Sequence, residues 1–226
     1  MIINMTGGGA AKPKLTSIAV TTQPTKTAYN VGDAFSTSGM EVTAYFDDGS
    51  SSVVSGYTYS PTTIVVGTNT ITISYAHEGI TKTTTLTVSG TLWLYNQGTE
   101  YSGGITTMRS DMKQADHLYF RSTSDAIRFA YTTAKQDLSK ATTLHVETYA
   151  SWGVGDNAVM GITASINWSD LESGKENWTS YTTCQTAYQS TATSTLSLTS
   201  VSGSYYILIY GRSDTHAWQV KKIWIT

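Results

Sequence analysis

The residue types that most often perform catalysis or hold metals are sparse in this chain of 226 residues. No two of its four histidines are spaced as an i, i+4 pair on one helical face, and none lies beside the cysteine, so no zinc motif is present. The single cysteine, Cys184, has no partner for an internal disulfide, and its alternating surroundings predict a small packed apolar side chain. We therefore expect no cofactor and no metal site.

Carboxylates could form a different catalytic site, because a glycoside hydrolase needs two of them facing each other across a cleft. Glu147 is the best placed. With the period of two of a β-strand, His145, Glu147 and Tyr149 share one face, and Leu144 and Val146 share the other. The polar and aromatic face fits a sugar-binding surface, and it equally fits the solvent side of an antiparallel sheet. No Gly-x-Ser-x-Gly elbow occurs either, so we predict that the chain is not an enzyme.

The tryptophans point to binding rather than to catalysis. Two lie in alternating segments and are expected in a core or an interface: Trp93 and Trp224. The others lie at predicted strand ends or in loops: Trp152, Trp168, Trp178 and Trp218. Exposed rings hold the apolar face of sugars and anchor interfaces, whereas core packing is the alternative for each ring. The candidate glycan-binding residues are Trp152, Trp168, Trp178, His145, Glu147 and Tyr149.

Composition narrows the class of protein. Charged residues make up only 13% of the chain, aromatic residues 11%, and the formal net charge is −2. Without a basic stripe, nucleic acid is not an expected partner. No apolar run approaches the length of a membrane-spanning helix, so membrane insertion is not expected. Strands with Thr, Ser and Tyr on their outer faces account for this composition.

Three pieces are predicted along the chain: a flexible Gly-rich arm over 1–13, short strands over 14–89, and about nine further strands over 91–226. In the second piece, Glu41–Phe46 alternates and is followed by the hairpin signal Asp48-Gly49. Asn69–Tyr75 alternates as well. Strands at this spacing, with turn residues between them, predict an antiparallel sandwich.

Several motifs within 14–89 keep a common order and spacing. They are Pro24-Thr-Lys-Thr-x-Tyr29-x-Val31-Gly32-Asp33-x-Phe35, Tyr45-x-Asp47-Asp48-Gly49-Ser50 and Ile71-x-Ile73-x-Tyr75. This pattern resembles a bacterial immunoglobulin-like domain of the group-3 type. The resemblance implies an Ig-like β-sandwich that serves as a spacer or display module and has no enzymatic activity.

The third piece ends in Gly203-Ser-Tyr-Tyr-Ile and Val220-x-x-Ile223-Trp224-Ile225, which resembles the closing strands of jelly-roll, carbohydrate-binding-like domains. Its opening, Leu94-Tyr-Asn-Gln-Gly-Thr-Glu, is similar to C-terminal domains of tailed-phage virion proteins. The predicted fold class is therefore all-β, an N-terminal Ig-like β-sandwich followed by a C-terminal jelly-roll-like β-sandwich.

These resemblances imply a non-enzymatic phage virion surface protein, a head decoration, head fibre or tail-associated protein, for display and adhesion to host-surface or mucus glycans. The start of the chain lacks a signal-peptide pattern, so we expect synthesis in the host cytoplasm and a place on the virion surface. Gly7, Gly8 and Gly9 are then candidates for a virion-docking arm. Expected partners are other virion proteins, cell-wall or mucin glycans, and further copies in a homo-oligomer. The alternatives are a secreted bacterial adhesin or carbohydrate-binding module and, more remotely, a glycan depolymerase.

Overall fold

The computed structural model describes residues 12–100, 105–107, 112–120, 127–152, 158–167, 177–185, 189–212 and 217–226. The regular elements of this part of the chain are all β-strands, so the predicted all-β class is confirmed. The described residues divide into two compact units. Unit 1 takes the chain up to Thr27, Ala34–Thr63 and Thr70–Val88, and unit 2 takes Ala28–Asp33, Ile64–Asn69 and Ser89–Thr226.

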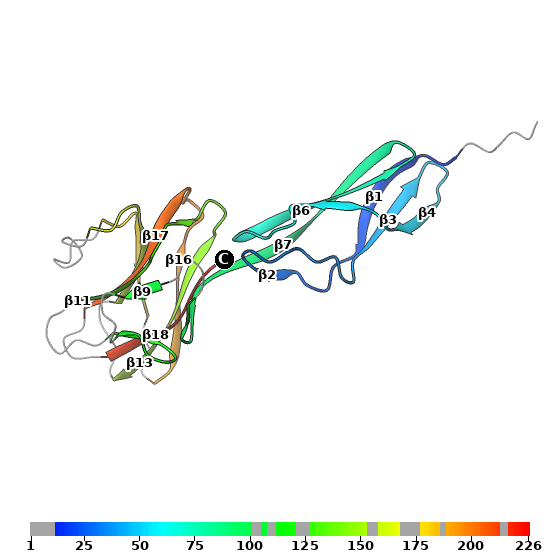
Figure 1. Cartoon of the computed structure of the whole chain (residues 1–226). Helices are drawn as coiled ribbons and strands as arrows, with labels where there is room; N and C mark the ends of the chain where they lie inside the picture. The colour runs from blue at the N-terminus through cyan, green and yellow to red at the C-terminus, as the bar shows by residue number, and fades with distance from the viewer. Residues whose placement is uncertain are drawn as a thin grey trace, which may run out of the picture. The chain divides into compact units, whose positions relative to one another are not determined.

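Unit 1 is built from two small antiparallel sheets (Figure 1). One sheet has the order β1-β3-β4, and the other is the β5-β6-β7 end of a longer sheet that continues through β7. Their bounds are β1 (Leu15–Thr22), β3 (Glu41–Phe46), β4 (Ser51–Val54), β5 (Thr58–Ser60), β6 (Gly67–His77) and β7 (Ile80–Asn96). Strand β7 is 17 residues long, and its second half belongs to unit 2 together with the short β2 (Ala28–Asn30).

Local sequence accounts for much of unit 1. Strand β3 has the predicted bounds, and its inward residues Val42 and Ala44 are 0% exposed. The turn that follows is held by the Asp48 carboxylate, which accepts hydrogen bonds from the backbone N–H and the hydroxyl of Ser50. Alternation in β6 buries Ile71 and leaves Thr70 and Thr72 outward or half-buried, as its period of two predicts.

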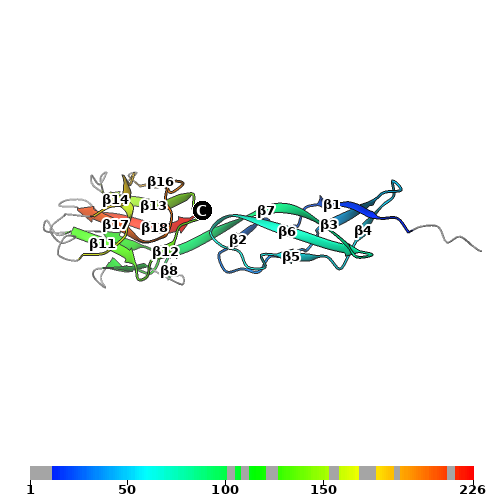
Figure 2. The same cartoon turned by 90° about the horizontal axis from the view of Figure 1, so that it is seen from above.

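Unit 2 is a larger sandwich of two mainly antiparallel sheets (Figure 2). The first sheet has the order β16-β13-β18-β7, with β10 paired to β18, β8 paired to β7 and the short β2 paired in parallel to β7. The second has the order β15-β14-β17-β11-β9, with β12 paired to β17. Their bounds are β8 (Thr99–Glu100), β9 (Ile105–Thr107), β10 (Leu118–Phe120), β11 (Ile127–Thr132), β12 (Gln136–Asp137), β13 (Thr143–Trp152), β14 (Ala158–Thr163), β15 (Ser180–Thr183), β16 (Thr191–Ser197), β17 (Ser204–Arg212) and β18 (Ala217–Ile225).

The inner faces of these two sheets form one apolar core. It includes Leu144 of β13, Ile223 of β18, Met160 of β14 and Ile209 of β17, all 0% exposed. Cys184 lies in the same core, as predicted, and burial raises the pKa of its thiol to about 12. A thiol in this setting is an unreactive apolar side chain.

Trp218 lies at the start of β18, so its predicted place at a strand end is confirmed. The ring is nevertheless not exposed. It is 1% exposed, belongs to the core, and stacks on Phe120 with ring centroids 4.1 Å apart. Its residue pairs with Phe120 through the β10–β18 ladder, so the short strand β10 supplies the cover that the sequence pattern did not reveal. Within the described residues, no helix is long and apolar enough to cross a bilayer.

Candidate functional site

The outer face of the first sheet of unit 2 gathers the predicted polar and aromatic residues of β13. Because Leu144 and Val146 point into the core, His145, Glu147 and Tyr149 point outward. Register places His145 opposite Trp224 and Glu147 opposite Lys222 of the neighbouring strand. We call this surface the β13–β18 face, and define it by Trp93, His145, Glu147, Tyr149, Lys222 and Trp224.

Three rings form a ladder across adjacent strands of this face. The His145 and Trp224 rings are nearly parallel, with an interplanar angle of 2° and centroids 4.8 Å apart. On the other side of β18, the Trp93 ring of β7 lies 5.5 Å from the Trp224 ring at 33°. Because β18 lies between β13 and β7, both ring faces of Trp224 are occupied by a neighbour. A ligand that lies along this face therefore meets the edge of the Trp224 ring rather than its faces.

A neutralised ion pair lies beside the ladder. The ammonium of Lys222 is 3.0 Å from Oε1 of Glu147 and donates to Oε2 at 3.1 Å. The two side chains are only 28% and 17% exposed, so the pair is partly removed from water. Tyr149 completes this end of the face, with the Lys221 ammonium 6.0 Å from its ring centroid. The face is therefore polar and holds fixed donors and acceptors, and the charges of its Glu147–Lys222 pair cancel.

The neighbouring strand β16 extends the polar surface with a row of hydroxyls. Thr193 pairs with Glu147 and Thr195 pairs with His145, and both threonines are exposed. The alternate residues Ser194 and Leu196 are buried, so the outward direction of the threonines follows from the strand period. Hydroxyls in this position can donate or accept hydrogen bonds to a ligand laid across the strands.

The chemistry of the face is that of a binding surface. Burial lowers the pKa of His145, so the imidazole is neutral near pH 7, and its Nε2 lies 3.1 Å from the Thr226 hydroxyl. Glu147 is the single carboxylate of the described face and is engaged with Lys222, so the pair of free carboxylates of a glycoside hydrolase is not assembled here. Among the described residues, no group of three or more His, Cys, Asp or Glu is placed to hold a metal ion.

The predicted tryptophans have different places. Trp178 lies on the outer side of the other sheet, where it packs half-buried with Phe129 and Leu208, and its ring centroid is 5.7 Å from that of Tyr181. The structure therefore does not bring Trp178 together with His145. Trp152 ends β13, but only its backbone is described. Trp168 lies outside the described residues, and so do Gly7, Gly8 and Gly9.

Sequence reasoning did not include Trp93 and Trp224 in the candidate site, because both were expected in a core or an interface. The structure places both half-buried on the outer face. A usable signal was present for Trp224: once Ile223 and Ile225 are assigned to the core, a period of two turns Trp224 outward. No local signal places Trp93 beside it, because their pairing depends on a register shift between β18 and β7.

A search of solved structures finds several matches, among them two of very low sequence identity. One structure concerns the promiscuous specificity of carbohydrate-binding modules of the β-sandwich superfamily, with 12% identity and a TM-score of 0.33, covering 95% of this chain and 100% of that one. The other is SGBP-B from a complex xyloglucan utilization locus in Bacteroides uniformis, with 8% identity and a TM-score of 0.26, covering 95% of this chain and 72% of that one. Similarity at this level identifies no ligand for the chain, and a search of curated proteins finds no match.

The family comparison is specific for the N-terminal part of the chain. The motifs of 14–89 predicted a resemblance to group-3 Ig-like domains. These comparisons do not show the predicted resemblance to tailed-phage virion proteins, which stays a prediction. Residues 22–89 match the family model of the bacterial Ig-like domain (group 3), so the resemblance predicted from the motifs is confirmed for this stretch.

Proposed function

We propose that this protein is a non-enzymatic display module that binds glycans through the β13–β18 face. The observation that carries the proposal is the joint presence, on one sheet face, of the ring ladder, the Glu147–Lys222 pair and the threonine row of β16. Sugars present apolar C–H faces and rings of hydroxyls. Such ligands are matched by aromatic rings beside fixed hydrogen-bonding groups, and they need no net charge.

The charge of the chain and its N-terminal domain support the same role. With 13% charged residues and a net charge of −2, the chain offers no strong field for anionic polymers. A group-3 Ig-like match over 22–89 fits a spacer that carries a binding domain. Binding at one face is expected to be weak, and several linked copies would raise avidity by roughly 10²–10⁴.

The biological setting that we propose is the surface of a tailed-phage virion, with other virion proteins and further copies of this chain as partners. This proposal rests on the short strings that resemble phage virion proteins, and the alternative is a secreted bacterial adhesin. Antibody labelling of purified phage particles, compared with labelling of the bacterial surface, separates the two settings. Label on bacteria alone would overturn the virion setting and leave glycan binding intact.

The binding proposal is tested on an array of bacterial wall glycans and mucin glycans. The test variant is Tyr149→Ala, and the matched control is Tyr181→Ala, because Tyr181 is 60% exposed on the other sheet. We expect at least tenfold weaker binding by Tyr149→Ala, about 1.4 kcal/mol, and unchanged binding by the control.

A second pair of variants blocks the face without removing any packing. Thr195→Arg places a long side chain beside His145 on the β13–β18 face, and Thr183→Arg does the same on the exposed edge strand β15. Loss of glycan binding in Thr195→Arg alone is expected. Equal binding by both variants, with melting temperatures unchanged, would contradict the placement of the site.

A further inference from the structure

Two adjoining cavities lie at the Trp93 end of the ring ladder. One has a volume of about 440 Å³ and is lined by Trp93, Asn30 and Thr91 among others. The other has a volume of about 390 Å³ and reaches Val65, Val66 and Lys140. They share Val31, Leu92 and Gln136, and all of their lining residues belong to unit 2. We call the two together the Trp93 pocket. Volumes of several hundred Å³ are typical of small-molecule sites.

The walls of the pocket are held by close backbone approaches. A Cβ on Gly90 would lie 2.0 Å from the Val65 carbonyl oxygen, so only glycine lets β7 run this close to Val65. A Cβ on Gly67 would lie 1.9 Å from the Lys140 carbonyl oxygen, and Gly67 also has a φ of +83°. The segment Ile64–Asn69, which carries the lining residues Val65 and Val66, is therefore fixed against both β7 and the turn after β12.

The buried side chain of Asn69 holds the same segment in place by hydrogen bonds. This side chain is 2% exposed, accepts a hydrogen bond from the Val65 N–H, and donates to the carbonyl oxygens of Val65 and Gly67. All hydrogen-bonding atoms of the Asn69 amide are thus committed to the backbone of the wall. A site whose wall is held in this way is preformed, which lowers the entropy cost of ligand binding.

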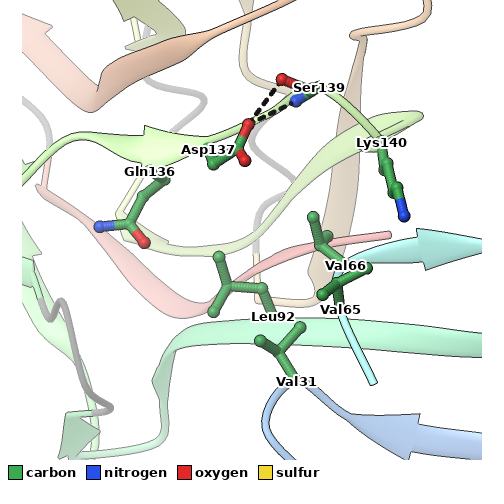
Figure 3. Close-up of a pocket in the computed structure, with 8 residues that line it drawn as sticks. All are labelled: Val31, Val65, Val66, Leu92, Gln136, Asp137, Ser139 and Lys140. Atoms are coloured by element: carbon green, nitrogen blue, oxygen red, sulfur yellow. Dashed lines mark hydrogen bonds between the residues drawn. The ribbon is translucent and has the colours of Figure 1, made fainter. Parts of the chain in front are cut away.

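The pocket has an apolar side and a polar side. In Figure 3 the side chains of Val31, Val65, Val66 and Leu92 lie together, with Gln136 at one end of the group and Lys140 at the other. Asp137 is turned toward Ser139, whose N–H and hydroxyl both donate to Oδ1 of Asp137. These hydrogen bonds and the nearby Lys140 lower the pKa of Asp137, so the rim carries one negative and one positive charge. A neutral ligand with a small apolar group and an amide matches this lining.

We propose that the Trp93 pocket is a subsite for an N-acetylated amino sugar, with the sugar ring against Trp93 and the acetamido methyl group against the valines and Leu92. Asn30 and Gln136 line the same cavity beside Trp93. This inference deepens the proposed glycan binding and rests on it. We propose an N-acetylated sugar because a hydroxyl in place of the acetamido group would leave the space between the valines and Leu92 empty.

The position of Trp93 supports the assignment. Trp93 belongs both to the β13–β18 face, through its contact with Trp224, and to the lining of the cavity. The proposed subsite and the proposed glycan surface therefore share this residue.

The test is isothermal titration of the full chain with the trisaccharide of N-acetylglucosamine and, separately, with the trisaccharide of glucose. The pocket variant is Val31→Glu, since Val31 is 37% exposed and tolerates a charged side chain without loss of core. Val53→Glu is the matched control, because Val53 is 63% exposed on β4 of unit 1. The parent is expected to prefer the N-acetylated sugar about tenfold, as one small apolar group in a fitted pocket allows. Val31→Glu is expected to lose that preference, and Val53→Glu to keep it.

The other outcomes of this titration show whether the subsite alone fails or the proposed glycan binding fails with it. If the parent binds both trisaccharides equally, or if Val31→Glu keeps the preference, the subsite is overturned while glycan binding stands. If the parent binds other glycans on the array and neither trisaccharide, the subsite is again overturned alone. If the parent binds no glycan at all, the proposed function and the subsite fall together.

Discussion

The two sheets of unit 2 both carry aromatic side chains on their outer faces, but they use them differently. On the second sheet, Phe129 and Leu208 point outward and are 0% and 1% exposed, because Trp178 and its neighbours cover them. On the first sheet, the outward rings of His145 and Trp224 lie among a Glu–Lys pair and exposed threonines. The outer face of the second sheet is therefore a covered apolar patch, and that of the first sheet is a partly exposed polar surface.

This difference shows that the location of a tryptophan in a loop or a strand is a poor guide to its role. Trp178 was predicted at a strand end or in a loop and as a candidate ligand contact, but it covers apolar side chains. Trp224 was predicted in a strand, in a core or an interface, but it belongs to the polar face. What decides the role is the chemistry of the residues beneath and beside the ring.

The largest expected effect follows from removing the ring that covers the apolar patch on the second sheet. Trp178→Ala uncovers Phe129 and Leu208 and is expected to lower the free energy of unfolding by about 3 kcal/mol, the lower end for removal of a packed tryptophan. Chemical denaturation measures the change. Tyr181→Ala is the control, because Tyr181 touches Trp178 from an exposed position and its loss is expected to cost less than about 1 kcal/mol. A Trp178→Ala variant as stable as the parent would contradict the structural role.

A smaller effect is expected from the ion pair of the polar face. Lys222→Met leaves the half-buried Glu147 carboxylate without its cation, which is expected to cost about 1–2 kcal/mol in urea denaturation. Adding Glu147→Gln to the same chain is expected to restore part of the loss, because the buried charge is then removed. Lys12→Met removes the partner of Glu78 in an exposed pair, and no measurable change is expected there. Equal losses at both lysines would show that the β13–β18 pair is no more shielded than a surface pair.

The smallest effect is a pH dependence that belongs to the polar face. Because burial lowers the pKa of His145 below its ordinary value of 6.5, the unfolded chain binds the His145 proton more readily than the folded chain. The free energy of unfolding is not reduced by His145 above pH 6.5. It decreases as the pH drops from 6.5 toward the pKa of His145 in the folded chain. His145→Phe keeps a ring against Trp224 and removes the titration. Melting temperatures of the two proteins between pH 7.5 and 5.0 are expected to diverge, with the parent losing more, and parallel curves would refute this account of His145.

Local alternation predicted a good part of the fold. The bounds of β3, the turn at Asp48-Gly49 and the inward Ile71 and Ile73 all follow from a period of two and from turn chemistry. The same rule placed His145, Glu147 and Tyr149 on one face, and the structure confirms that grouping. These features depend on residues within one strand or one turn.

The rest of the site depends on long-range pairing, which one sequence does not reveal. His145 meets Trp224 only because β13 pairs with β18, and Trp93 joins them through a shifted register between β18 and β7. The wall of the Trp93 pocket likewise needs Gly90 to lie against Val65, a contact between residues on different segments. Burial of Trp218 depends on Phe120, which lies far away in the chain.

The most direct test of the central claim follows the indole N–H signals of the tryptophans by NMR during titration with a glycan that the array selects. Trp→Phe variants assign the signals of Trp93, Trp224 and Trp178. Glycan binding at the β13–β18 face predicts concentration-dependent shifts for Trp93 and Trp224 and none for Trp178. Shifts confined to Trp178, or binding that leaves both ladder signals in place, would contradict the account and move the site to the other sheet or elsewhere in the chain.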